Sequence, residues 1–254
     1  WMKLKHFFKV TFSKITVAYP QNNETKSYLK HIKNININYL EKLKFSENYE
    51  ENLEKINFKL KSNFNKKKIW IASSTHKSEE IFCGKAHLQL KRKIKNLLTI
   101  IIPRHIHRTN EIMAELKDLN LRVALHSSNK KNLKDVDIYL VDTFGETKKF
   151  HKIGCSVFLG GSIISRGGQN PLEAARFGAK ILHGPNTDNF KDVYKLLKVF
   201  KISKRVNSFK QLASSIVFKK NKNDGVKIKN IGEKILKKTI KELDKYILNE
   251  FKKT

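Results

Sequence analysis

Apolar and polar positions follow a pattern along most of the chain that is typical of parallel βαβ units. Short apolar runs rich in β-branched residues are separated by segments whose apolar residues recur at helical spacing. We expect strands over residues 69–73, 97–103, 121–127, 136–143, 156–162, 180–183 and 201–206. We expect helices over residues 77–95, 108–119, 170–177, 189–199 and 209–218. This order predicts an α/β fold with a Rossmann-like, doubly wound and mostly parallel sheet.

Two shorter regions precede this series. Residues 15–19, 24–32 and 35–39 predict a strand, a helix and a second strand, which together make one βαβ unit. The segment 42–68 is highly charged, and it predicts a connecting helix because apolar residues recur at three- and four-residue spacing, namely Leu53, Ile56 and Leu60. We expect the domain boundary to fall in this segment.

The region after the series predicts a loop and a helix. Residues 219–225 are polar and predict the loop. A long amphipathic helix should follow, packed through an apolar stripe that consists of Ile228, Ile231, Ile235, Ile240, Leu243 and Ile247.

Composition adds a basic surface to this picture. The chain has 254 residues, of which 39% are hydrophobic, enough for one sizeable core. The 53 Lys and Arg residues outnumber the 23 Asp and Glu residues, so the formal net charge is +30. Such a charge suits a nucleic acid, a phosphorylated lipid or an anionic membrane. Because the basic residues are mostly Lys, and Asn and Ile are also abundant, an AT-rich genome could produce the same composition without selection for binding.

The two cysteines do not indicate a zinc site or a disulfide framework. Cys83 falls in an expected helix and Cys155 just before an expected strand, so we interpret both as reduced packing thiols. No apolar run approaches the roughly twenty residues that span a bilayer. No signal-peptide pattern follows Trp1 and Met2.

Ligands of doubly wound sheets collect at the carboxyl ends of the strands, so the loops that follow the strands are the candidate sites. Residues 73–76, Ser-Ser-Thr-His, suit either a cap for the next helix or a ligand contact. Residues 103–105, Pro-Arg-His, place Arg104 at the sheet edge. A guanidinium there can bind a phosphate through two hydrogen bonds, or it can remain a solvated charge.

Two later loops contain glycine. Residues 142–146, Asp-Thr-Phe-Gly-Glu, allow close backbone approach before a helix start, although a plain turn explains them equally well. Residues 160–173 join a strand end, a glycine-rich loop and a helix start, where Asn170 fits an N-cap and Glu173 a capping box. Capping does not explain the glycine pair 167–168, which we expect to open the positive end of the helix to a phosphate. Glu173 could then accept hydrogen bonds from ribose hydroxyls.

Five segments, in this order and at these spacings, resemble the C-terminal domain of the transferases of 3-deoxy-D-manno-octulosonic acid (Kdo), a family of GT-B glycosyltransferases. The segments are ASSTHKSEE, IIPRHIHR, DTFGET, FLGGSIISRGGQNPLEAARFG and HGPNTDNF. The resemblance covers about residues 69–197, and the glycine-rich segment is its most specific part. Residues 40–45, LEKLKF, are similar to the end of the family's N-terminal domain, although Glu41 and Lys42 stand where Gly-Asn is usual.

The resemblance implies three parts and a binding site. Residues 1–45 would be a remnant of the N-terminal acceptor-binding domain, residues 46–67 a linker helix, and residues 68–254 the nucleotide-sugar domain with its C-terminal amphipathic helix. The implied CMP pocket consists of Pro103, Arg104, Phe144, Gly145, Glu146, Asn170, Pro171, Leu172 and Glu173. Phe144 replaces a common Met and Gln169 replaces the usual His, so contacts through these two side chains are expected to differ.

The reaction implied is the transfer of Kdo from CMP-Kdo to a lipid A precursor in lipopolysaccharide biosynthesis, with inversion at the anomeric carbon. It would take place at the cytoplasmic face of the bacterial inner membrane, where an anionic membrane surface is an expected partner. Arg104 and helix amides would stabilise the phosphate of the departing CMP. The family's general base lies in the N-terminal domain, and no part of this chain matches it, so no catalytic residue is expected here.

No cofactor, metal or nucleic acid is expected. Asp135-Val136-Asp137 resembles a DxD metal motif but comes at the start of an expected strand, and the cluster of His105, His107 and Arg108 lacks a further placed ligand. Three alternatives remain open: another GT-B enzyme that uses a UDP- or GDP-sugar, a basic nucleic-acid-binding module, and a degenerate fragment that binds without catalysis.

Overall fold

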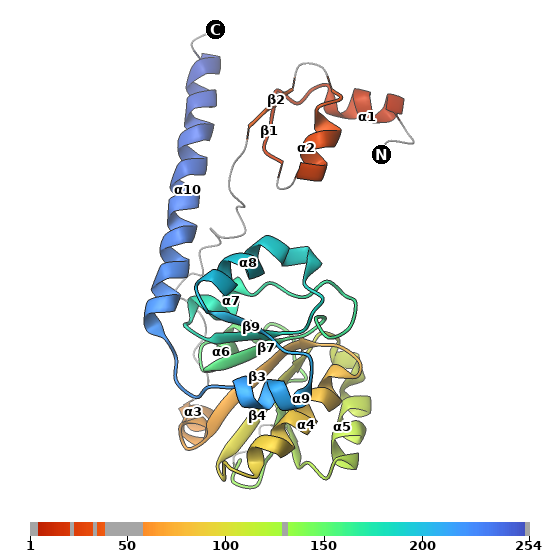
Figure 1. Ribbon diagram of the computed structural model, residues 1–254, viewed down its shortest axis with the longest axis vertical. Helices are drawn as coiled ribbons and strands as arrows, with labels where there is room; N and C mark the ends of the chain where they lie inside the picture. Colours follow the sequence, from red (N-terminus) through yellow and green to blue (C-terminus); the bar gives the residue numbers. More distant parts are fainter. Residues whose placement is uncertain (1–4, 21–22, 33–34, 39–57, 129–131, 252–254) are drawn as a thin grey trace. The chain divides into compact units, whose positions relative to one another are not determined.

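The chain forms two compact units in the computed structural model (Figure 1). The larger unit spans residues 49–228, and the smaller combines residues 1–48 with 229–254. The structure describes residues 5–20, 23–32, 35–38, 58–128 and 132–251.

The larger unit is built on a seven-stranded sheet whose neighbouring strands are all parallel. The strands stand in the order β5-β6-β4-β3-β7-β8-β9. Their bounds are β3 Lys68–Thr75, β4 Leu97–Pro103, β5 Val123–Leu125, β6 Ile138–Leu140, β7 Ser156–Leu159, β8 Lys180–His183 and β9 Ser203–Arg205. Because the chain extends from β3 first towards β4 and later towards β7, the sheet is doubly wound, and the predicted fold class is confirmed.

Helices cover both faces of this sheet (Figure 1). One face carries α4 Glu79–Lys91, α5 Thr109–Asp118 and α9 Phe209–Ser215. The other carries α6 Thr147–His151, α7 Leu172–Arg176 and α8 Lys191–Val199. Shorter pieces are α3 Phe58–Asn65 and the 3-10 turns η3 Ile106–Arg108 and η4 Asp188–Phe190. This double cover explains why the central strands read as uninterrupted apolar runs.

The core lies where alternate side chains of the strands meet these helices. Trp70 and Phe158 are fully buried among residues of α4, α5 and α9. On the other face, Phe64 of α3 contacts the rings of Tyr139 and Phe150 edge-on, at 5.5 and 6.3 Å between centroids. The free thiol of Cys83 is part of the first cluster.

The acidic pair at residues 135 and 137 lies at the amino end of β6, at the edge of the sheet opposite to the carboxyl ends of the strands. The carboxylate of Asp137 is buried and contacts Lys91 at 2.6 Å and Arg122 at 3.3 Å. Burial alone would raise the pKa of Asp137, but hydrogen bonds from His87, Lys91 and Arg122 outweigh it and hold that pKa well below its usual range. These contacts give Asp137 a structural role. Among the described residues, no cluster of acids, histidines or cysteines could hold a metal ion.

The final helix, α10 Lys222–Phe251, begins earlier than the sequence predicts, so the predicted loop 219–225 is wrong in its second half. Gly225 explains the difference, because a Cβ there would lie 2.6 Å from the carbonyl oxygen of Arg176. Its lack of a side chain lets the first helical turn pack on the end of α7. The predicted apolar stripe is buried at Ile228 but exposed at Ile240 and Leu243. No helix in the described part of the chain is long and apolar enough to cross a membrane.

The smaller unit contains the predicted βαβ unit. Strands β1 Val17–Ala18 and β2 Asn36–Ile37 are parallel, and α2 Asn23–Leu29 connects them. Leu29 and Ile32 form its buried centre. An additional helix, α1 Lys5–Phe12, precedes it and was not predicted. Most of the predicted linker helix, and residues 40–45, lie outside the described residues.

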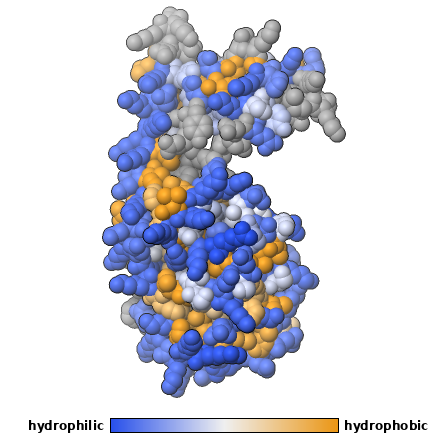
Figure 2. Space-filling view, in the orientation of Figure 1, coloured by the Kyte–Doolittle hydropathy of each residue, from blue (hydrophilic) through white to orange (hydrophobic). Residues whose placement is uncertain are grey.

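The surface of the larger unit is mostly hydrophilic, as the high content of charged residues predicts. Figure 2 shows hydrophilic residues over most of the visible face of the larger unit, with smaller apolar patches between them. The excess of Lys is therefore displayed to solvent rather than paired in the interior, as expected for long charged side chains.

Candidate functional site

A cavity of about 460 Å³ opens at the carboxyl edge of the sheet, beside the point where the strand order reverses. We call it the Arg104 pocket. It is lined by Ser73, Ser74, Arg104, Gly145, Thr147, Lys148, His151, Leu159, Gln169, Asn170 and Glu173. These residues come from the ends of β3, β4 and β7 and from the first turns of α6 and α7. The cavity is therefore formed by the strand-end loops that the sequence selected.

The structure brings together four of the nine predicted CMP-binding residues. They are Arg104, Gly145, Asn170 and Glu173. The other five do not line the cavity: Pro103 ends β4, Pro171 and Leu172 are buried, Phe144 is 79% exposed, and Glu146 pairs with neighbouring side chains. Whether CMP contacts any of the nine stays a prediction.

Arg104 is held at the edge by a local irregularity in β3. The pairing of β3 with β4 shifts between Ser73 and Thr75, and Ser74 takes a left-handed conformation with φ of 55°. The backbone N–H of Arg104 donates to the carbonyl of Thr75 at 2.9 Å. The Arg104 side chain is exposed and pairs with no acid among the described residues. Its guanidinium is free to bind an anion.

Glu79, at the start of α4, fixes the shape of the loop after β7. Its buried carboxylate accepts hydrogen bonds from the backbone amides of Gly161 (2.7 Å), Ser162 (3.1 Å) and Ile163 (2.9 Å). A fourth comes from the amide of His76, at 3.0 Å. One acidic side chain thus ties the loops after β3 and β7 together. Glu79 was not among the predicted site residues, although an acid in the first turn of a helix is a signal that the sequence contains.

The glycines of the long loop also serve packing. A Cβ on Gly160 would lie 2.3 Å from the carbonyl oxygen of Ser74, so the two strand-end loops can meet only with glycine there. Gly167 and Gly168 have φ of 78° and 73°. A Cβ on Gly167 would lie within 2.9 Å of the side chain of Asn189. This packing against the loop after β8 accounts for the pair 167–168 without a phosphate.

The start of α7 confirms the cap predicted at Asn170 and corrects the capping box predicted at Glu173. Asn170 does cap the helix, because its Oδ1 accepts from the backbone N–H of Leu172 at 3.1 Å. That amide is therefore occupied, and α7 has only five residues. The capping box predicted for Glu173 is not formed in the described structure, since the Glu173 carboxylate accepts no hydrogen bond from the backbone N–H of Asn170. The Glu173 carboxylate lines the cavity instead.

His151 lies beneath Glu173 and was not predicted. Its Nε2 lies 2.9 Å from the hydroxyl of Ser73, and its Nδ1 lies 3.9 Å from Oε2 of Glu173. Burial, with a smaller contribution from Lys220, lowers the pKa of His151 to about 3. The ring is neutral near pH 7, so its contact with Glu173 is not an ion pair.

The turn after β6 is held by its own side chains. Asp142 accepts hydrogen bonds from the amide of Ser127 at 2.9 Å and from its hydroxyl at 2.5 Å. Glu146 contacts Lys149 at 3.1 Å. Gly145 takes a φ of 83°, and a Cβ on it would meet nothing within 4 Å. The turn therefore presents its backbone, rather than its acids, to the Arg104 pocket.

No family model matches the sequence, but solved structures are similar in fold, among them the following two. The C-terminal CMP-Kdo binding domain of WaaA from Acinetobacter baumannii aligns over 59% of this chain and 79% of its own, with a TM-score of 0.57 and 24% identity. A glycosyltransferase from Rickettsia africae aligns over 97% of this chain and 67% of its own, with a TM-score of 0.52 and 16% identity. The fold is that of a GT-B glycosyltransferase domain.

The sequences of curated relatives narrow this class. The 3-deoxy-D-manno-octulosonic acid transferase of Rickettsia felis is 30% identical over 254 aligned residues, which cover 97% of this chain. The enzyme of the same name from Haemophilus influenzae is 35% identical over 129 residues, or 51% of this chain. This chain belongs to the Kdo transferase family. It spans 54% of the Rickettsia relative and 30% of the Haemophilus one.

Proposed function

We propose that this chain is the donor-binding part of a Kdo transferase and that it binds CMP-Kdo in the Arg104 pocket. The observation that carries the proposal is the Arg104 guanidinium, which has no acid partner in the described structure and lines a cavity of about 460 Å³ at the switch point of the sheet. Nucleotides bind doubly wound sheets at this position. The membership of the chain in the Kdo transferase family supports CMP-Kdo as the nucleotide sugar.

The cavity offers complementary groups for a nucleoside monophosphate. Arg104 supplies a planar cation that can hold two phosphate oxygens, while the Glu173 carboxylate supplies acceptors and the amide nitrogen of Asn170 a donor for ribose hydroxyls. Gly145 presents a turn without a side chain, so a ligand can approach its backbone closely. Phosphate and ribose would thus lie against opposite charges within one cavity.

The proposed reaction is an inverting transfer of Kdo to a hydroxyl of a lipid A precursor. The acceptor oxygen forms a bond to the anomeric carbon, while the bond from that carbon to the phosphate oxygen breaks and CMP leaves with the electron pair. Arg104 stabilises the charge that grows on the phosphate. The base that takes the acceptor proton is assigned to the acceptor-binding part of the enzyme, because the family resemblance places it there and no part of this chain matches that motif.

We place the reaction at the cytoplasmic face of the inner membrane, as part of lipopolysaccharide biosynthesis. The net charge of +30 supports this location, because each well-placed Lys contributes about 1 kcal/mol of attraction near anionic headgroups. The same charge would also suit a nucleic-acid-binding module, which is the second candidate function. The sequence contains no nucleic-acid-binding motif that supports it.

Calorimetry with CMP, UMP, GMP and a random oligonucleotide separates these functions. We expect CMP to bind more tightly than UMP or GMP, and oligonucleotide binding to be weak and strongly salt-dependent. Tighter binding of UMP or GMP would indicate another GT-B enzyme. Tight oligonucleotide binding without CMP binding would refute the proposal.

A further inference from the structure

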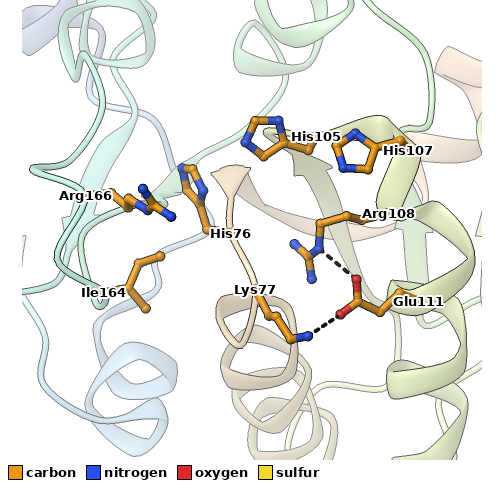
Figure 3. Close-up of a pocket in the computed structure, with 8 residues that line it drawn as sticks. All are labelled: His76, Lys77, His105, His107, Arg108, Glu111, Ile164 and Arg166. Carbon is orange, nitrogen blue, oxygen red and sulfur yellow. Dashed lines mark hydrogen bonds and ion pairs between the residues drawn. The ribbon is translucent and has the colours of Figure 1, made fainter.

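A second cavity, of about 440 Å³ and drawn in Figure 3, lies at the same edge of the sheet as the Arg104 pocket. We call it the histidine pocket. It is lined by His76, Lys77, His105, His107, Arg108, Glu111, Ile164 and Arg166. The two cavities use neighbouring residues of the same loops: Ser74 and Arg104 line the first, and His76 and His105 line the second. A molecule held in one is therefore next to the other.

Two of the cations in the histidine pocket are already neutralised. Arg108 contacts the buried Glu80 at 3.1 Å and Glu111 at 3.0 Å. Lys77 contacts the other oxygen of Glu111 at 3.0 Å. Figure 3 shows these three side chains pointing towards one another, away from Arg166. They form the wall of the cavity and do not supply a free charge.

Arg166 is the cation that remains available. It is exposed, and its guanidinium has no acid partner among the described residues. The backbone of Arg166 is fixed from behind, because its carbonyl accepts a hydrogen bond from the side chain of Asn189 at 3.1 Å. The adjoining Gly167 packs against the same side chain. The loop therefore presents Arg166 from a defined position.

His76 supplies a polar atom that lacks a partner. Its Nε2 is buried and has no hydrogen bond in the described structure. Its ring meets the ring of His105 nearly edge-on at 5.6 Å, and His105 lies 5.5 Å from His107. Figure 3 shows the His76 ring between Arg166 and His105. An unpaired ring nitrogen next to a free guanidinium suits an oxyanion, which can accept from both.

A metal ion does not suit these histidines. The guanidinium of Arg166 is adjacent to them, and positive charge lowers the affinity for a cation. Burial, followed by the charges of His105, Arg166, Arg104 and Arg108, lowers the pKa of His76. Positive charge around the ring favours an anion.

We propose that the histidine pocket binds a second anionic group of the transfer reaction, a carboxylate or phosphate whose oxygens contact Arg166 and His76. The binding of an oxyanion here follows from the pocket alone. The statement that a substrate carries it rests on the proposed function. A carboxylate would come from the donor sugar and a phosphate from the lipid acceptor.

The test is an NMR titration of the whole chain labelled with ¹⁵N-histidine, with inorganic phosphate and with free Kdo as separate probes. We expect a saturable shift of the His76 ring signal, which a His76→Gln variant identifies. Arg166→Ala should weaken the binding about tenfold or more. The matched control is Arg92→Ala, at the exposed arginine that follows α4, and this variant should bind like the unchanged chain.

Each outcome decides the proposal. A shift caused mainly by Kdo assigns the group to the donor, and a shift caused mainly by phosphate assigns it to the acceptor. No shift with either probe, or unchanged binding in Arg166→Ala, overturns the site. Failure of CMP to bind would instead count against the proposed function, so the two failures are distinguishable.

Discussion

The carboxylate of Glu79 should be worth more to this fold than any other single polar group described above. In Glu79→Gln, one oxygen becomes an amide nitrogen. The new amide nitrogen is a donor that faces two backbone N–H donors, either those of Gly161 and His76 or those of Ser162 and Ile163. Two charge-assisted hydrogen bonds are lost, each worth about 1.5–3 kcal/mol. We therefore expect the free energy of unfolding to fall by about 3–6 kcal/mol, a large part of the roughly 5–15 kcal/mol of a typical domain.

Urea unfolding followed by circular dichroism measures this loss directly. The matched control is Glu233→Gln on the exposed side of α10, which should change stability by less than about 0.5 kcal/mol. Amide exchange of Gly161, Ser162 and Ile163 should accelerate in Glu79→Gln, because these N–H groups lose an acceptor or its charge. If Glu79→Gln and Glu233→Gln unfold at the same urea concentration, the loop is held by something other than this carboxylate.

Three further predictions concern the pocket. His151 has a folded pKa of about 3 against about 6.5 unfolded, so the unfolded chain binds the extra proton and His151 lowers stability by about 1.4 kcal/mol for each pH unit below 6.5. The effect of His151→Asn on stability should therefore shrink as the pH falls from 6.5 to 4.5, and a constant effect in urea unfolding would contradict a neutral ring. Gly160→Ala should cost about 2–4 kcal/mol in the same assay because its Cβ meets the Ser74 carbonyl, whereas Gly145→Ala should cost only about 1–2 kcal/mol of backbone strain. In calorimetry, Arg104→Ala should weaken CMP binding about 10- to 150-fold and Arg92→Ala should not, since one charged contact contributes about 1.5–3 kcal/mol.

The sequence predicted the sheet well because the strands are buried on both faces. The strands β4 and β8 match their predicted ranges. Helices cover both faces of the sheet, so each central strand must be a continuous apolar run, and the polar residues on either side mark its ends. The start of α10 was missed because it depends on Gly225 packing against Arg176, a contact between residues far apart in the chain. Helical periodicity carries no information about such a contact.

The sequence predicted which loops form the site, but not every residue that shapes it. The strand-end rule selected Arg104, Gly145, Asn170 and Glu173, which do line one cavity. His151 and Glu79 were missed because each acts through a partner on another loop, Ser73 for the first and the amides of residues 161–163 for the second. No spacing along the chain indicates those pairings.

A crystal structure of the chain with CMP tests the central claim most directly. We predict that the phosphate lies in the Arg104 pocket, with its oxygens at about 2.7–2.9 Å from the Arg104 guanidinium, as in other charge-assisted pairs. The ribose should lie towards Asn170 and Glu173. CMP bound elsewhere on the chain, with the Arg104 side chain turned to solvent, would contradict the account.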